Sequence, residues 1–428
     1  MTTKSNNYLY QIAIIGLLFA VMGFVTWLNG ILIPFLKKAC QLSDQQAFFV
    51  ATAFFAAYFF LALPASWILK QLGTKRGMAV GLMTMAVGCL IFIPASQGRS
   101  FPLFLTGLFI VGAGLALLQT AANPYVSVIG PIESAATRIS IMGICNKLAG
   151  ILGNLVFAGL LLKNVDTIQE QIDATTDLAV KSQLLNDLSG RVVMPYTIIA
   201  LILLVVAFVI SRSSLPDISE QTASDTEGGD TATSAGKTSI FQFPYALFGA
   251  LAIFFYVGAE VMAGDLISVY GKNLGFKTDQ SKFFTTFGLI GLLLGYVTSI
   301  VLIPKYVRQE TWLAVSAVLG IVLTIGSFYT EGSSAVGCLA TLGFANAVMW
   351  PAIFPLGING LGKFTNTGAA LLVMGIAGGA IIPPFYGWLY EKAGVGLDFR
   401  SAFVVIMFVC YAYILWFGRI GHKIGLKV

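Results

Sequence analysis

The chain has 428 residues, of which 57% are hydrophobic and 10% are charged, and its formal net charge is +6. A soluble domain normally contains about a quarter charged residues, so this composition excludes an ordinary water-soluble globular protein. The basic residues lie singly in short connections and form no basic face, which argues against a nucleic-acid partner.

Six long apolar segments precede residue 212, and each is long enough to cross about 30 Å of hydrocarbon as a helix. We expect these membrane spans at about residues 8–36, 47–70, 77–97, 101–125, 138–163 and 192–211. Together they form a first six-helix bundle, residues 1–211. The long connection from Asn164 to Arg191 carries apolar positions among acids and amides, so we expect helix on the outer surface there.

Residues 212–239 change character, because Ser, Thr, Gly, Asp and Glu dominate. This composition is typical of a flexible, water-exposed linker, here expected in the cytoplasm. A second bundle, residues 240–428, contains expected spans at about 240–270, 283–303, 311–330, 334–358, 365–390 and 398–420. The fold class is therefore an all-α membrane protein with twelve transmembrane helices in two six-helix bundles, the organisation of duplicated secondary transporters.

Polar side chains within the first six spans indicate a wet central cavity, because such groups are costly against lipid. Gln119 and Asn123 are four residues apart on one helical face, beside the helix-loosening Pro124. An amide pair there suits recognition of a hydroxyl-rich solute. In span five, Asn146 and Lys147 lie far from either membrane surface, and we expect both to contact substrate.

A lysine in the middle of a span must have a partner. The mid-span acids are Glu260 and Asp265 on span seven. We expect Lys147 to pair with one of them, Glu260 first. A structural pair that only holds two helices together is one interpretation, and coupling to the substrate or to a transported ion is the other.

Span ten places Asn346, Trp350 and Phe354 at intervals of four, on one helical face. Aromatic rings beside amides suit a sugar, whose faces are apolar and whose edges form hydrogen bonds. Core packing is the alternative explanation for such a stripe. Asn29 in span one is a further candidate cavity residue. Glu133 and Arg138, between spans four and five, are expected to form a gate ion pair.

The chain resembles the fucose permease (fucose:proton symporter) branch of the major facilitator superfamily in the run Gln119-Thr120-Ala121-Ala122-Asn123-Pro124-Tyr125, in Gly130-Pro131 and in Arg138. Two other runs look more like the glucose/galactose transporter subgroup: Trp27-Leu28-Asn29-Gly30 with Pro34, and Tyr256-Val257-Gly258-Ala259-Glu260. The resemblance implies a monomeric symporter in the bacterial inner membrane, with a central sugar site reached by alternating access. We expect both termini in the cytoplasm, because that orientation places more Lys and Arg residues inside than outside.

The resemblance also exposes a departure. The proton-coupled fucose members carry an aspartate where this chain has Gly30 and a glutamate where it has Gln119, which puts proton coupling by that route in doubt. We favour sodium as the coupling ion, held by Glu260 or Asp265 with amide and backbone oxygens. Proton coupling through either acid is the alternative, and uniport is a third.

Other functions fit the sequence less well. An enzyme would need a catalytic constellation, yet the one histidine, His422, lies next to the C-terminus and no cofactor-binding motif occurs. We therefore expect no enzyme activity and no cofactor beyond sodium or a proton as co-substrate. A receptor would need an output domain. The serious competitors are a symporter for fucose or N-acetylglucosamine and a drug or sugar exporter of the same fold, because fold alone does not determine function.

Overall fold

The computed structural model describes residues 2–128, 135–213, 215, 237–303, 305–361, 364–391 and 397–425, without the side chains of residues 2–9, 29, 44, 70, 124, 127–128, 135–138, 365–366 and 391. Twelve helical segments in these ranges are long and apolar enough to cross a membrane, which confirms the predicted number of spans. The predicted linker, residues 212–239, falls largely outside the described residues.

The first half of the chain forms spans one to six. Its helices are α1 (Thr2–Thr26), α2 (Asn29–Ala39), α3 (Asp44–Leu72), α4 (Thr74–Gln97), α5 (Phe101–Val128), α6 (Ala135–Leu161), α7 (Val165–Ala174), α8 (Leu178–Gly190) and α9 (Val193–Arg212).

The second half forms spans seven to twelve. Its elements are η2 (Ile240–Gln242), α11 (Pro244–Gly264), α12 (Ile267–Asn273), α13 (Thr278–Ser281), α14 (Phe284–Leu302), α15 (Gln309–Tyr329), α16 (Gly332–Asn346), α17 (Met349–Ile358), α18 (Thr365–Met374), η4 (Gly375–Ala377), α19 (Gly378–Glu391), α20 (Phe399–Arg419) and η5 (Gly421–Lys423).

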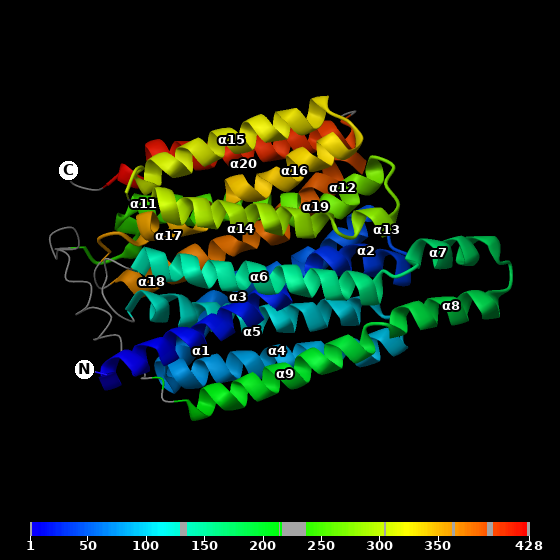
Figure 1. Cartoon of the computed structure of the whole chain (residues 1–428), viewed down its shortest axis with the longest axis horizontal. Coiled ribbons are helices and arrows are strands. Elements are labelled where there is room, and N and C mark those ends of the chain that lie inside the picture. Colours follow the sequence, from blue (N-terminus) through cyan, green and yellow to red (C-terminus); the bar gives the residue numbers. More distant parts are fainter. Residues whose placement is uncertain are drawn as a thin grey trace.

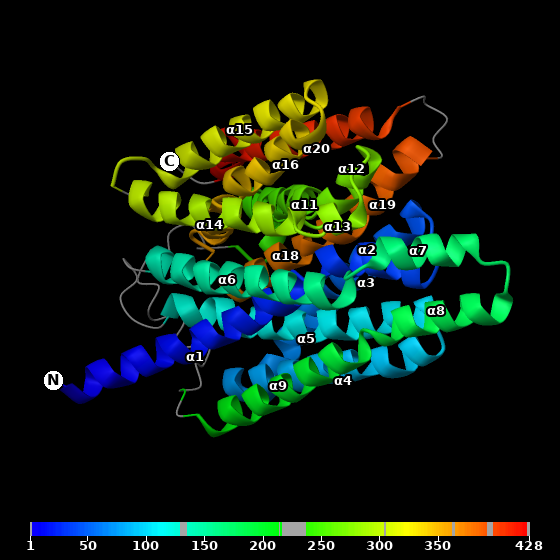
Figure 2. The same cartoon turned by 45° about the vertical axis from the view of Figure 1, so that its right-hand side comes forward.

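The two halves lie side by side with their long helices roughly parallel (Figures 1 and 2). Both termini lie at one end of the bundle, and we call the opposite end, which carries α7, α8 and α13, the distal end. The halves meet where α3 packs against α18, η4 and α19, and where α6 packs against α14. The space between these two seams therefore lies between the halves.

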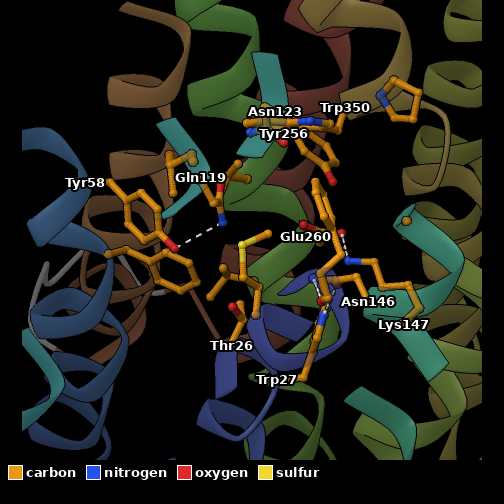
Figure 3. Close-up of a pocket in the computed structure, with 18 of the residues that line it drawn as sticks. Thr26, Trp27, Tyr58, Gln119, Asn123, Asn146, Lys147, Tyr256, Glu260 and Trp350 are labelled. Carbon is orange, nitrogen blue, oxygen red and sulfur yellow. Dashed lines mark hydrogen bonds and ion pairs between the residues drawn. The ribbon is translucent and has the colours of Figure 1, made fainter. Parts of the chain in front are cut away.

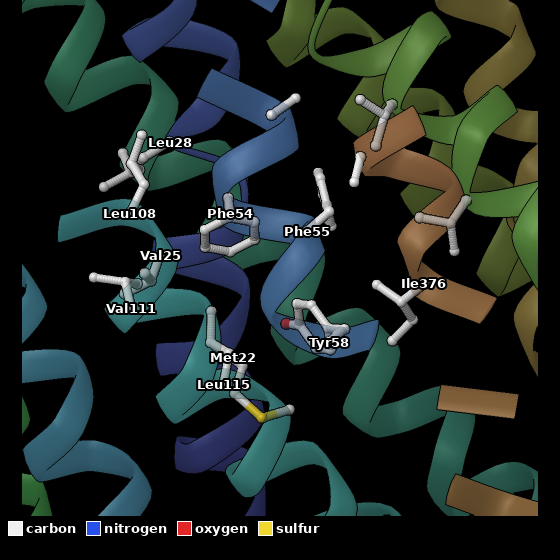
Figure 4. Close-up of a cluster of buried hydrophobic side chains, with 14 of the residues drawn as sticks. Met22, Val25, Leu28, Phe54, Phe55, Tyr58, Leu108, Val111, Leu115 and Ile376 are labelled. Atoms are coloured by element: carbon white, nitrogen blue, oxygen red, sulfur yellow. The ribbon is translucent and has the colours of Figure 1, made fainter. Parts of the chain in front are cut away.

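The core of the first half is apolar. Side chains from α1, α3 and α5 interdigitate there, and Ile376 of the second half approaches the same cluster (Figure 4). Large apolar side chains also remain exposed on the outer faces of the spans, for example Phe60 and Trp67 on α3 and Phe208 on α9. In water such a surface would be unfavourable, but it matches lipid.

Three of the described spans have short non-helical breaks near their middle, and span eleven passes through the 3-10 segment η4 between α18 and α19. Span one breaks at residues 27–28 between α1 and α2, span seven at 265–266 between α11 and α12, and span ten at 347–348 between α16 and α17. In span ten, Pro351 follows the break and has no N–H to bond the carbonyl four residues earlier. Broken helices expose backbone carbonyls inside a membrane protein only where protein or a cavity satisfies them.

The connection between spans five and six is helical, as predicted, but it does not lie flat. After α6, Asn164 adopts a left-handed conformation (φ 53°) that turns the chain into α7. Asp177 caps α8 by accepting a hydrogen bond from Ala179 N–H at 2.8 Å. The α7 and α8 helices run past the end of the bundle as a helical hairpin (Figure 1), so the acidic α7 stands beyond the apolar part of the span.

Candidate functional site

A cavity of about 130 Å³ lies between the two halves at the level of the helix breaks (Figure 3). A cavity of this size suits one small solute better than a drug-sized ligand. Polar and aromatic residues of α1, α3, α5 and α6 line one side, and those of α11, α14 and α17 line the other. They include Thr26, Trp27, Tyr58, Gln119, Asn123, Asn146, Lys147, Tyr256, Glu260, Asp265, Tyr296 and Trp350.

Lys147 of α6 is the charged centre of this cavity, and only 6% of its surface is exposed. Its Nζ lies 3.4 Å from Oε1 of Glu260 on α11 and 4.1 Å from the centroid of the Trp27 ring. A buried ammonium needs such an anionic partner, and an aromatic face adds further attraction. The predicted pairing of Lys147 with Glu260 is therefore confirmed, and it joins the first half of the chain to the second.

Asp265 lies directly after α11, in the break of span seven, and is 2% exposed. Among the residues that the structure describes, none donates a hydrogen bond to its Oδ1. A buried carboxylate anion without a partner costs roughly several kcal/mol. Lys147 is engaged by Glu260, so the Oδ1 atom of Asp265 stays without a hydrogen-bond partner among the described residues.

The amides of the first half are positioned differently from one another. Gln119 of α5 lines the cavity and donates through Nε2 to the hydroxyl oxygen of Tyr58 on α3, at 3.2 Å. Asn146 is already committed to α1: its Nδ2 donates to the Phe19 carbonyl at 3.2 Å, and its Oδ1 accepts from Trp27 Nε1 at 3.4 Å. This hydrogen bond of Gln119 thus uses its amide nitrogen, whereas both amide atoms of Asn146 are engaged with Phe19 and Trp27 of span one.

The opposite wall is aromatic. Trp350 of α17 lines the cavity, with Tyr256 beside it at a centroid distance of 6.5 Å. Phe354 stacks on the far side of Trp350 at 5.5 Å with an interplanar angle of 25°, and it supports that ring without lining the cavity. Flat apolar rings beside amide and carboxylate groups are suited to a sugar.

The structure does not bring Asn346 to the cavity, contrary to the prediction. Asn346 is 1% exposed, and its Oδ1 accepts a hydrogen bond from the Tyr411 hydroxyl at 2.9 Å. The spacing of four that linked it to Trp350 assumed a continuous helix. The break at residues 347–348 interrupts that register, so the two side chains face different surroundings.

Three predicted residues cannot be placed. The side chain of Asn29 lies outside the described part of the chain, although its backbone begins α2. Glu133 and the side chain of Arg138 also lie outside the described residues, so the predicted gate ion pair stays a prediction.

Sequence reasoning missed the tyrosines of the site, Tyr58, Tyr256 and Tyr296. Tyr256 precedes Glu260 by four residues, so helical spacing could have placed both on one face. Tyr58 and Tyr296 lie among many aromatic residues of apolar spans, and nothing in their spacing distinguishes them from core residues.

The two halves are also tied together at the distal end. Asp166 of α7 receives Lys38 Nζ of α2 at 2.8 Å and the backbone N–H of Asp279 on α13 at 3.0 Å. Nearby, the Thr52 hydroxyl of α3 donates to the Ala380 carbonyl of α19 at 2.8 Å. We call the contact of Asp166 with Lys38 and Asp279 the distal latch.

Comparisons with known proteins agree with this architecture. The family model of the Major Facilitator Superfamily matches residues 15–374. A "Glucose/galactose transporter" of Brucella abortus is 33% identical over 431 residues, covering 99% of this chain and 96% of that protein. The "L-fucose-proton symporter" of Escherichia coli is 30% identical, covering 97% and 94%. A crystal structure of the transporter FucP in the outward conformation superposes with a TM-score of 0.75 at 29% identity, covering 97% of this chain and 99% of FucP.

Proposed function

The chain belongs to the Major Facilitator Superfamily, and from that premise we propose that it is a cation-coupled symporter that imports a hexose such as glucose or galactose. It works by alternating access, as a monomer in the bacterial inner membrane with both termini in the cytoplasm. The distal end then faces the periplasm. The similarity to a glucose/galactose transporter and to an L-fucose-proton symporter supports the substrate class.

The charge cluster in the cavity carries this proposal. Lys147 and Glu260 form an ion pair between the halves, and Asp265 lies buried beside them without a donor for Oδ1. A cation that binds Asp265 changes the net charge that Lys147 and Glu260 experience. Because that pair joins the halves, occupancy of Asp265 biases the equilibrium between the two open states.

The coupling ion that the geometry supports best is a proton on Asp265. One carboxyl oxygen suffices for a proton, whereas sodium prefers about six oxygen ligands, as other hard cations do. The relative named as a fucose-proton symporter supports the same choice.

Sodium, favoured by the sequence, is the second candidate. Its supporting observation is the break of span seven beside Asp265, because interrupted helices supply backbone oxygens for sodium in other transporters. Glu260 and Asp265 would be its side-chain ligands. Glu260 could bind sodium only after its ion pair with Lys147 has broken.

Uptake of labelled hexoses into proteoliposomes tests the proposal, with an imposed proton gradient compared with an imposed sodium gradient at matched membrane potential. Accumulation driven by protons, and lost in Asp265→Asn, supports the proposed mechanism. Accumulation driven by sodium alone makes the second candidate correct. No hexose accumulation under either gradient overturns the hexose proposal and directs the search to fucose, N-acetylglucosamine or export.

A further inference from the structure

The break in span one forms a hydrogen bond with Asn154, a side chain that does not line the cavity among the described residues. Asn154 of α6 is 0% exposed, and among the described residues it does not line the cavity. Its Nδ2 donates to the carbonyl of Trp27 at 2.9 Å and to the carbonyl of Gly150 at 3.0 Å. The first of these bonds crosses from α6 to the residue at the break.

The Trp27 carbonyl is free to accept this bond because of the break. In a continuous α-helix it would accept from the N–H of Ile31, four residues on. Here the Ile31 N–H bonds to the Leu28 carbonyl at 3.0 Å, one residue later. A carbonyl released in this way inside a membrane protein needs another donor, and Asn154 supplies it.

The same face of α6 fits closely against the break. A Cβ on Gly150 would lie 2.7 Å from Cδ1 of Trp27, and a Cβ on Gly153 would lie 3.0 Å from the Phe24 ring. Asn154 follows Gly150 by four residues, so both lie on one side of the helix. Hydrogen bond and close packing together therefore fix the backbone of Trp27 against α6.

Trp27 in turn contacts the charge cluster through Lys147 and the break of span seven through Gly264. Its ring lies under Lys147 Nζ at 4.1 Å, and its Nε1 donates to Asn146. On the other side, a Cβ on Gly264 would lie 2.9 Å from Cζ3 of this ring, next to Asp265. A shift of Trp27 would therefore disturb Lys147 and the span-seven break together.

We propose that Asn154 is a positioning residue of the transport site: its amide holds the interruption of span one, and thereby the Trp27 ring, in register with Lys147. It touches neither solute nor ion and acts through Trp27. The expected effect of Asn154 on transport rests on the proposed function. Its expected effect on the position of Trp27 does not.

A substrate-free measurement tests the positioning directly. The chain has six tryptophans, so replacing the other five by Phe leaves Trp27 as the sole reporter. In this background Asn154→Leu, which keeps the volume and removes the donor, is expected to increase acrylamide quenching of Trp27 about twofold. Thr324→Val is the control, because it removes an equally buried hydrogen bond within α15.

Transport supplies the second readout, in otherwise native protein. Asn154→Leu is expected to raise KM for the hexose about tenfold, the size expected for one buried hydrogen bond, with kcat changed less than about twofold. In a Trp27→Phe background, the same substitution is expected to change KM by less than about threefold, since interacting residues are not additive.

A second variant disturbs the packing against the Trp27 ring and tests the proposal if Asn154→Leu does not fold. Gly150→Ala is expected to increase Trp27 quenching, and Gly159→Ala on the same helix, with nothing within 4 Å, is the control. Unchanged quenching in folded variants, or an equal KM effect with and without Trp27, would overturn the proposal. Absence of hexose transport by the native protein would instead contradict the proposed function, while the acrylamide quenching of Trp27 would still test the positioning role of Asn154.

Discussion

The ammonium of Lys147 lies between a carboxylate oxygen of Glu260 at 3.4 Å and the face of the Trp27 ring at 4.1 Å. The carboxylate belongs to the second half of the chain and the ring to the first. The lysine thus connects the halves at the cavity, where a solute and an ion would bind. Whatever changes the charge around Lys147 also changes how strongly the halves hold together.

Removing this charge is therefore expected to cost both stability and coupling. Lys147→Gln leaves Glu260 buried without its partner, and breaking such a pair costs about 3–5 kcal/mol. We expect a lower Tm in detergent and loss of gradient-driven sugar accumulation. The double variant Lys147→Gln, Glu260→Gln should recover much of the Tm but not the accumulation. Exposed Lys163→Gln is the control, and full ion-dependent accumulation by Lys147→Gln would show that the pair is not involved in coupling.

This pair was predictable because the physics left few choices. A lysine in the middle of an apolar span requires an anion, and span seven offers Glu260 and Asp265 in the middle of the membrane. Twelve spans were likewise predictable, since the length of an apolar run depends on the bilayer and not on packing.

The positions of side chains near the helix breaks could not be predicted from the sequence. Asn346 was assigned to the cavity because helical periodicity was carried through residues 347–348, where the helix is interrupted. Asn154 was not predicted, because its role is to donate to the Trp27 carbonyl at the break. In the sequence alone it cannot be distinguished from any other polar residue in a span. Contacts that depend on where a helix stops cannot be derived from its period.

The distal latch gives a prediction about conformation. Asp166→Asn weakens the contacts to Lys38 and Asp279, so the distal end should open more often. A cysteine in place of Thr26, in a chain freed of its five native cysteines, reports access to the cavity. We expect a membrane-impermeant maleimide added from the distal side to label it several-fold faster, as for loss of about 1 kcal/mol. Asp173→Asn, exposed on the same helix, should leave the rate unchanged.

The latch should not respond to pH in the range where transport is normally measured. Burial opposes ionisation of Asp166, but the hydrogen bonds from Lys38 and the Asp279 N–H outweigh it and lower its pKa to about 2. A lowered pKa means that the latch is fully present above the ordinary aspartate pKa of about 4 and is lost as pH falls through about 2. Maleimide labelling should thus stay constant from about pH 5 to 8. A labelling rate that rises within that range in native protein, but not in Asp166→Asn, would contradict this assignment.

A glycine at the same end makes the last prediction. Gly387 of α19 faces α3, and a Cβ there would lie 2.5 Å from ring carbons of Phe48. Gly387→Ala should therefore push the halves apart distally and accelerate labelling of the cavity cysteine, although alanine favours a helix by about 1 kcal/mol over glycine. Gly337→Ala on α16 is the matched control, because a Cβ there meets nothing within 4 Å.

The two distal changes should also combine in a defined way. Asp166→Asn and Gly387→Ala act on one equilibrium between closed and open distal ends through contacts that share no residue. Their free energies should add, so the labelling rates should multiply until the open state predominates. If Gly387→Ala were only a packing defect within the second half, it would lower the Tm without changing the labelling rate, and the double variant would label no faster than Asp166→Asn alone.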